Sequence, residues 1–176
     1  MEDEQAKTLE ALKFAIQMEI DGKEYYQRAG KGSGNMVGKE LFQWLADAED
    51  RHRQRFEEIY NDVKNKKVWP EVDIQTGKEE RLSTLFSREM KAAAPNIKAP
   101  SVELDIITKA TEMEKKSEDY YRDQGERSTS EAEKKFYEAL VAEERGHYLA
   151  LVDYREYIID PEGWLRKQEH HSLDGG

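Results

Sequence analysis

The segment AIQMEIDGKEYY, residues 15–26, decides the fold because it recurs 95 residues later as ATEMEKKSEDYY, residues 110–121. The two segments share Ala, Met, Glu and a Tyr-Tyr pair at matching positions. The same shift relates Leu45 to Leu140, Glu49 to Glu144 and His52 to His147. A register kept over about fifty residues without a gap indicates an internal repeat with two-fold pseudosymmetry.

Apolar residues at three-and-four spacing around the repeat predict four long helices. These helices are expected at about residues 4–29, 36–66, 101–126 and 131–159. A glycine-rich turn at 30–35 and a Ser-Thr-Ser turn at 128–130 make two antiparallel hairpins, which Trp69-Pro70 and Asp160-Pro161 bring to an end. The fold class is therefore all-α, a four-helix bundle made of two helical hairpins.

Residues 67–100 join the two hairpins and contain one amphipathic stretch, residues 82–90, which predicts a short helix. A connection of this length fits a crossover that carries the chain along the whole bundle. We therefore expect a single bundle domain over residues 1–160.

Residues 161–176 are expected to form a C-terminal tail of mainly polar surface. Trp164 and Leu165 are its docking residues. His170 and His171 are an alternative metal site, but we expect them to be solvated, as chain ends usually are.

Composition excludes several classes of function. The chain has 176 residues, 38% of them charged, and a formal net charge of -10, which would repel nucleic acid and anionic membranes. It has no cysteine, so disulfides, zinc fingers, iron–sulfur clusters and thiol nucleophiles are excluded, and any metal must be bound by Glu, Asp and His. We find no signal peptide or membrane span and expect a cytoplasmic protein.

Four carboxylates and two imidazoles lie on the apolar stripes of the predicted helices. They are Glu19, Glu49, His52, Glu114, Glu144 and His147. The glutamates of each hairpin stand 15 residues from the middle of their turn, which is roughly 22 Å at about 1.5 Å per residue. All four glutamates should therefore meet near the middle of the bundle.

Four ionised carboxylates in an apolar bundle are too costly without positive charge, and no Lys or Arg occupies a nearby stripe position. Two divalent cations would balance them, with one imidazole for each. A single Glu-x-x-His is more often a solvated surface pair, but two in register with two stripe glutamates favour a metal centre. Oxygen-rich ligation with one nitrogen suits iron or manganese better than zinc, and we expect two iron ions per chain, with manganese or zinc as substitutes.

Tyr26 and Tyr121 lie seven residues beyond Glu19 and Glu114 on the same helix faces. They either donate hydrogen bonds to the ligand carboxylates and support the chemistry, or only pack in the core. The sequence leaves both readings open.

Other residues near the predicted centre have simpler interpretations. Glu118 and Glu143 could each add a fifth carboxylate, but we expect both on a solvated face. Phe42 and Trp44 lie off the main stripe and serve either core packing or subunit contact, and as a subunit contact they would form a self-complementary surface patch for a homodimer.

The paired Glu and Glu-x-x-His signature on a repeated hairpin resembles the rubrerythrin branch of the ferritin-like di-iron carboxylate proteins, over residues 5–157. The resemblance implies a ferritin-like bundle, a non-haem di-iron centre on the six residues above, and oxidoreductase activity toward peroxide or dioxygen. The chain departs from the family pattern in two respects. The chain lacks the cysteines of a rubredoxin domain, so an external electron-donor protein is needed, and Ser117 replaces the further Glu of the peroxidases.

Two alternatives stay open at this point. The same centre could oxidise iron for storage, as ferritins do, or the metals could stabilise a bundle that has no catalytic role.

Overall fold

The computed structural model describes residues 2–66, 68–71 and 101–173, with side chains from residue 4 to residue 167 within these ranges. The helices are α1 (Glu2–Gly32), α2 (Met36–Lys66), α5 (Ser101–Arg127), α6 (Glu131–Ile159) and α7 (Pro161–Leu173). These ranges contain no strand. The predicted crossover helix lies outside the described residues.

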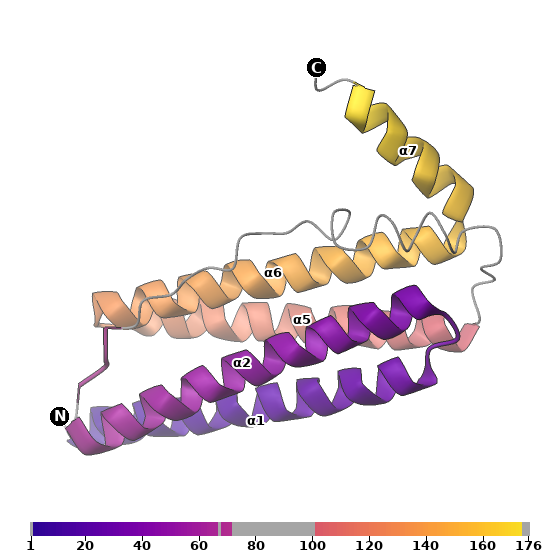
Figure 1. Cartoon of the computed structure of the whole chain (residues 1–176). Coiled ribbons are helices and arrows are strands. Elements are labelled where there is room, and N and C mark those ends of the chain that lie inside the picture. Colours follow the sequence, from indigo (N-terminus) through magenta and orange to yellow (C-terminus); the bar gives the residue numbers. More distant parts are fainter. Residues whose placement is uncertain (1, 67, 72–100, 174–176) are drawn as a thin grey trace.

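The four long helices lie side by side as two antiparallel hairpins, α1 with α2 and α5 with α6 (Figure 1). The bounds of α2 are those predicted, and the other three long helices agree within about three residues. Ser130 caps α6, because its side chain accepts a hydrogen bond from the backbone N–H of Glu133. The predicted all-α bundle of two hairpins is confirmed.

Helix α7 is a feature that the sequence analysis did not predict. The Asp160 side chain accepts a hydrogen bond from Gly163 N (3.0 Å), and the Asp160 carbonyl accepts one from Trp164 N (2.9 Å). Proline at the first helical position is favourable because its missing N–H would have no partner there. The Asp-Pro pair that ends α6 therefore also starts α7, which leaves the bundle at an angle (Figure 1).

Two apolar clusters fill the bundle, one toward each end. The Trp164 cluster includes Tyr26, Leu41, Phe42, Leu45, Ile107, Leu151, Tyr157 and Trp164. The Trp69 cluster includes Leu12, Phe56, Ile59, Trp69, Tyr121, Phe136 and Tyr137. Trp69 and Trp164 are themselves related by the 95-residue shift, so each hairpin is followed by a tryptophan that joins a different end of the core.

The docking of the predicted tail residues is confirmed. Trp164 is 3% exposed and its Nε1 donates a hydrogen bond to Asp153 Oδ1 at 2.6 Å, while Leu165 packs against the same cluster. The side chains of His170 and His171 lie outside the described residues.

Phe42 is in the core, so the predicted surface patch is wrong. Its ring is fully buried and contacts Tyr26 of α1 and Tyr154 of α6. Helix α2 thus packs against neighbours on two sides, and its apolar face is wider than the stripe used in the prediction. Trp44 is half-buried and contacts His147 edge-to-face.

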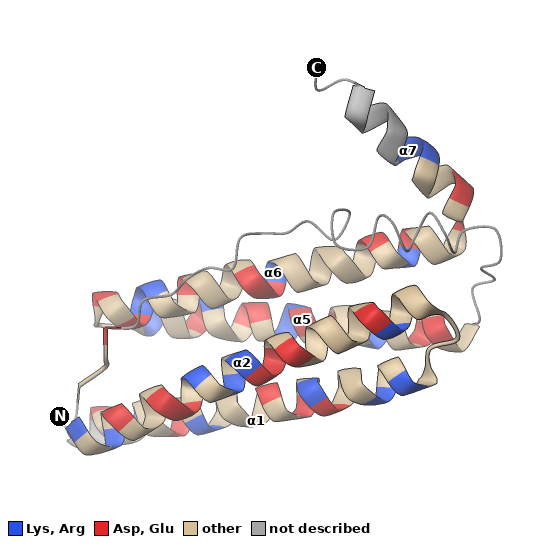
Figure 2. Cartoon of the chain, viewed as in Figure 1, with Lys and Arg blue, Asp and Glu red and all other residues tan. Residues whose placement is uncertain are grey.

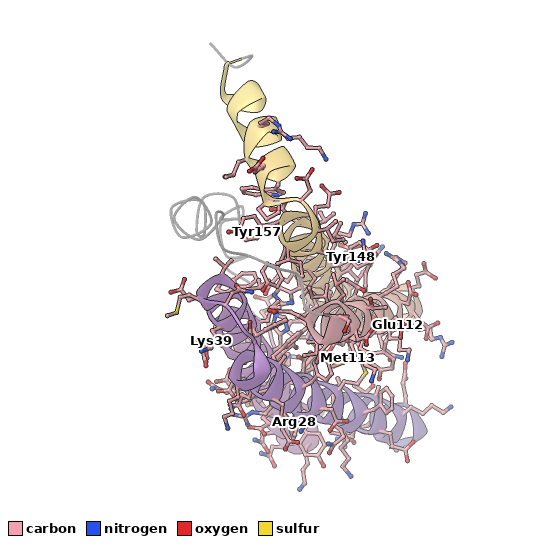
Figure 3. All side chains as sticks on the ribbon, turned by 90° about the vertical axis from the view of Figure 1, so that its right-hand side faces the viewer. Arg28, Lys39, Glu112, Met113, Tyr148 and Tyr157 are labelled. Atoms are coloured by element: carbon pink, nitrogen blue, oxygen red, sulfur yellow. The ribbon has the colours of Figure 1, made fainter. Side chains whose placement is uncertain are left out.

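The outer surface is highly charged. Acidic and basic residues alternate along the helices (Figure 2), and the exposed side chains of Arg28, Lys39 and Glu112 project at the periphery in the end-on view (Figure 3). None of the helices in the described part of the chain is both long enough and apolar enough to cross a membrane.

Candidate metal centre

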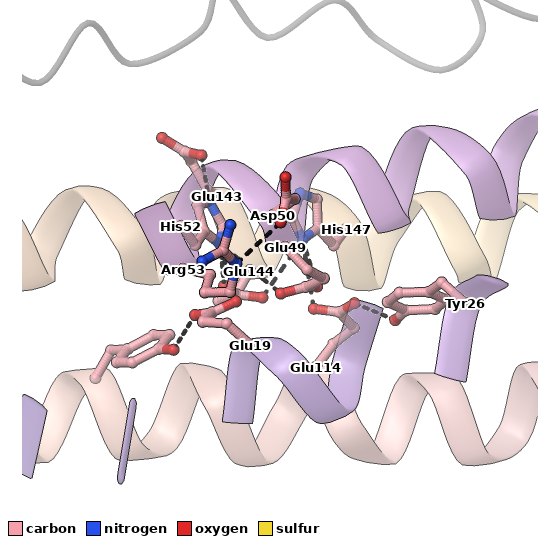
Figure 4. A network of polar contacts seen from close by, with 11 residues as sticks. Glu19, Tyr26, Glu49, Asp50, His52, Arg53, Glu114, Glu143, Glu144 and His147 are labelled. Atoms are coloured by element: carbon pink, nitrogen blue, oxygen red, sulfur yellow. Dashed lines mark hydrogen bonds and ion pairs between the residues drawn. The ribbon is translucent and has the colours of Figure 1, made fainter. Parts of the chain in front are cut away.

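The six predicted ligand residues come together in a buried layer between the two apolar clusters (Figure 4). Each is at most 5% exposed. Within the described residues, they form two overlapping sets whose ligand atoms lie within 4.8 Å of one another. One set is Glu19, Glu49, His52 and Glu144, and the other is Glu49, Glu114, Glu144 and His147.

The overlap of the sets gives the layer its organisation. Glu49 and Glu144 belong to both sets, while Glu19 with His52 and Glu114 with His147 belong to one set each. We call these two pairs the His52 half and the His147 half. Two shared carboxylates between two terminal Glu–His pairs is an arrangement suited to two bridged cations.

Both histidines turn the same nitrogen inward. His52 Nδ1 lies 3.2 Å from Glu144 Oε1 and 3.5 Å from Glu19 Oε2. His147 Nδ1 lies 3.4 Å from Glu144 Oε2 and 3.5 Å from Glu114 Oε2. Because Glu and His three apart share a helix face, each Glu-x-x-His presents an oxygen and a nitrogen to the same point.

Several inward atoms of the layer have no hydrogen-bond partner among the described residues. They are Glu19 Oε2, His52 Nδ1, Glu114 Oε2, both carboxylate oxygens of Glu144, and His147 Nδ1. Buried polar atoms are rarely left unpaired because desolvation is costly. Cations placed among these atoms would supply the missing partners, and the donor set of carboxylate oxygens with one imidazole each fits iron or manganese.

The protonation of the metal-free layer shows how strongly the carboxylates repel one another. Burial, followed by the charge of Glu144, raises the pKa of Glu114 to about 8, and burial with the charge of Glu19 raises the pKa of Glu49 well above its usual range. Burial opposes protonation of His147, but Glu114 and Glu144 raise its pKa to about 10. Protons therefore take the place that cations would occupy.

Glu144 behaves in the opposite way. Burial raises its pKa, but the nearby imidazoles of His147 and His52 outweigh that effect and hold the pKa well below the usual range. A carboxylate that stays ionised between both histidines is well placed to bind two cations at once.

The two tyrosines make hydrogen bonds that cross between the hairpins. Tyr26 on α1 donates to Glu114 on α5, and Tyr121 on α5 donates to Glu19 on α1. Burial and the neighbouring carboxylates raise the pKa of both phenols well above the usual value, so both keep their protons. The predicted hydrogen bonds to the terminal carboxylates are therefore present, in addition to core packing.

Neither flanking glutamate belongs to the two ligand sets, but the prediction of a solvated face is wrong for Glu118. Glu118 is 4% exposed and accepts a hydrogen bond from Arg122. Glu143 is half-buried, and its Oε2 lies 2.7 Å from His52 Nε2. Ser117 is also half-buried. The apolar stripes of the helices predict neither the burial of Glu118 nor the contact between Glu143 and His52.

A buried polar cluster near the α1–α2 turn was also missed. Glu103 Oε1 accepts hydrogen bonds from Ser33 Oγ (2.6 Å), Tyr154 OH (2.6 Å) and Asn35 Nδ2 (3.3 Å). A Cβ on Gly38 would lie 2.3 Å from both Ser33 Oγ and Tyr154 OH, so only glycine leaves room for these groups. The cluster joins the first turn to both helices of the second hairpin and is separate from the metal layer.

The chain matches the family model described as Rubrerythrin over residues 10–153. This range contains all six residues of the buried layer. Comparisons with curated proteins and with solved structures gave no significant match.

Proposed function

We propose that this chain, which belongs to the rubrerythrin family, is a non-haem di-iron oxidoreductase that reduces peroxide or dioxygen. The single observation that carries the proposal is the pair of overlapping ligand sets, which share Glu49 and Glu144 and leave six inward atoms unpaired. In this proposal Glu49 and Glu144 would hold both iron ions in common, and each half would supply one further Glu and one His. Manganese would fit the same donors, whereas zinc would bind them without redox chemistry.

The iron ions would supply the electrons of the reaction. Reducing hydrogen peroxide to two water molecules takes two electrons and two protons, and a pair of bound ferrous ions would provide one electron each. This sequence contains no cysteine, so we propose that a separate donor protein returns the two electrons.

The side chains around the layer set the conditions for that reaction. The Trp164 and Trp69 clusters flank the layer and limit water on two sides. Tyr26 donates a hydrogen bond to Glu114 Oε1, and Tyr121 donates one to Glu19 Oε1. These hydrogen bonds fix the orientation of the two terminal carboxylates. Among the described residues, only histidines form ion pairs with the four carboxylates of the layer, so no Lys or Arg competes with cations for these ligands.

The decisive experiment combines metal analysis with optical spectroscopy. Protein loaded anaerobically with ferrous iron is analysed for iron per chain and then mixed with one equivalent of hydrogen peroxide or with dioxygen. We expect about two irons per chain, as two-metal sites hold, and a ferric absorption band that disappears on reduction and returns with fresh oxidant. Failure to bind iron, or bound iron that stays ferrous with both oxidants, would overturn the proposal.

Two variants on α6 make a matched pair for this experiment. Glu144→Ala removes a shared carboxylate and should abolish both iron binding and the absorption band. Glu138→Gln changes an exposed glutamate on the same helix and should leave both unchanged. Light scattering on the loaded wild type tests the alternative of storage, since a closed shell that retains many irons per chain would contradict the oxidoreductase proposal.

We also propose a cytoplasmic homodimer. Phe42 is in the core, so the surface patch that the sequence suggested does not support the dimer. Sedimentation of the metal-loaded protein measures its oligomeric state.

A further inference from the structure

The 95-residue repeat preserves the ligands but not the residues behind them. Glu143 stands behind His52, and the matching residue of the first hairpin is Ala48, which is buried. Trp44 stands against His147, and its match in the second hairpin is Ala139. The two histidines are therefore equivalent toward the metal layer and different on their outer sides.

His52 has a carboxylate on its outer nitrogen. Its Nδ1 faces the ligand oxygens of the layer, and its Nε2 lies 2.7 Å from Glu143 Oε2 (Figure 4). When Nδ1 binds a cation, the ring proton must be on Nε2, where it donates to Glu143. A carboxylate in this position fixes the tautomer and the ring orientation and makes the imidazole a stronger electron donor.

His147 has an aromatic ring on its outer side instead. Trp44 contacts it edge-to-face, with ring centroids 5.3 Å apart. Among the described residues, the carboxylates that form ion pairs with His147 are only Glu49, Glu114 and Glu144 of the layer itself. Packing against Trp44 restrains the ring but adds no charge to it.

We infer that the two halves are unequal metal sites, with Glu143 as a positioning residue that makes the His52 half fill first and hold its cation more tightly. The inference rests on the proposed metal-binding function and deepens it. Since mutation of a residue that orients a metal ligand typically changes affinity by about 10- to 100-fold, the two halves should differ by a factor of this size.

Binding of two cations in separate steps by the wild type would not show that the halves are unequal. The shared carboxylates lower the affinity for the second cation even when the halves are equal. The test therefore isolates each half. His147→Ala leaves the His52 half, and His52→Ala leaves the His147 half. Cobalt(II) affinity of each metal-free variant is measured by calorimetry and by the visible spectrum of the bound ion. We expect the His147→Ala protein to bind cobalt about 10- to 100-fold more tightly than the His52→Ala protein.

Glu143→Gln is then added to each variant. It keeps the shape of the side chain and an acceptor oxygen but removes the charge, and Glu143 is half-buried, so the fold should tolerate the change. We expect at least about a tenfold loss of affinity in the His147→Ala background and no change in the His52→Ala background. Glu138→Gln is the exposed control on the same helix, and circular dichroism of each metal-free variant verifies the fold.

The outcomes separate this inference from the proposed function. Equal cobalt affinities of the two halves, or an equal loss from Glu143→Gln in both backgrounds, would overturn the inference while leaving the metal centre in place. A wild type that binds no cobalt or iron would overturn both.

Discussion

The two hairpins agree where they meet the metal layer and differ almost everywhere else. Glu19, Glu49 and His52 match Glu114, Glu144 and His147 at one shift, and the crossed tyrosines follow the same rule. One step further out, Lys23 and Asp50 of the first hairpin form an ion pair (2.7 Å), and the matching positions of the second hairpin carry the opposite charges, Glu118 and Arg145. Binding a cation restricts which residue can replace a ligand, whereas packing and surface charge admit many solutions.

The strongest test of this comparison contrasts shared with unshared ligands. Glu49→Ala or Glu144→Ala removes a carboxylate from both sets, so bound iron should fall from about two ions per chain to near zero. Glu19→Ala or Glu114→Ala removes a ligand from one set and should leave about one ion. Elemental analysis after gel filtration gives the counts, and the same loss from all four variants would show that the halves are not separate.

The layer as a whole is tested by removing the metal and varying the pH. Without metal, Glu114 with its pKa of about 8 and His147 with its pKa of about 10 hold protons that the unfolded chain releases near 4.5 and 6.5. The folded state thus binds more protons between about pH 4.5 and 10, so its free energy of unfolding should fall as the pH rises through this window.

Metal should reverse that slope, since cations bind the deprotonated ligands and their contribution grows as protons leave. We therefore expect chelated protein to melt at a lower temperature at pH 9 than at pH 6, and the metal-loaded protein to gain most at pH 9. Calorimetric melting curves at both pH values provide the measurement. A chelated protein that is more stable at pH 9 would contradict the protonated state of the layer.

The crossed tyrosines test whether identical residues at matching positions of the repeat contribute equally to metal affinity. Tyr26→Phe and Tyr121→Phe each remove one hydrogen bond to a terminal carboxylate and keep the buried ring. Each substitution should lower the metal affinity by roughly tenfold, which is the lower end of the range for mutations of residues that orient a metal ligand. Cobalt titration of both variants is the measurement, and clearly different losses would extend the inequality of the halves from the histidines to the tyrosines.

The smallest expected effect compares the two tryptophans that follow the hairpins. Trp164 Nε1 donates to Asp153, whereas Trp69 Nε1 is buried with no partner among the described residues. Replacement by Phe should cost more at Trp164 by about 1.5 to 3 kcal/mol, the value of a hydrogen bond to a charged group. Urea unfolding of the two variants gives the difference, and an equal cost would show that ring packing alone determines it.

The ligands could be read from the sequence because a repeated spacing and an apolar stripe both pointed to them. Phe42 and Glu103 could not, since each contacts two other parts of the bundle, and one-dimensional periodicity records only the main face. The burial of Glu118 beside Arg122 of its own helix left no periodic pattern either. Helix α7 was missed for another reason. Asp160-Pro161 predicts a helix end, but Asp as an N-cap and Pro at the first position are also starting signals.

The division of the layer between the hairpins also has a consequence in time. Each ligand set draws on both hairpins, since Glu144 of α6 completes the set of Glu19 and His52, and Glu49 of α2 completes that of Glu114 and His147. Contacts within a hairpin are close in the chain and form quickly, whereas docking of one hairpin on the other must first close the long connection between them. Neither hairpin can complete a ligand set alone. The rate at which a folding chain binds metal therefore reports how fast its two hairpins dock on each other.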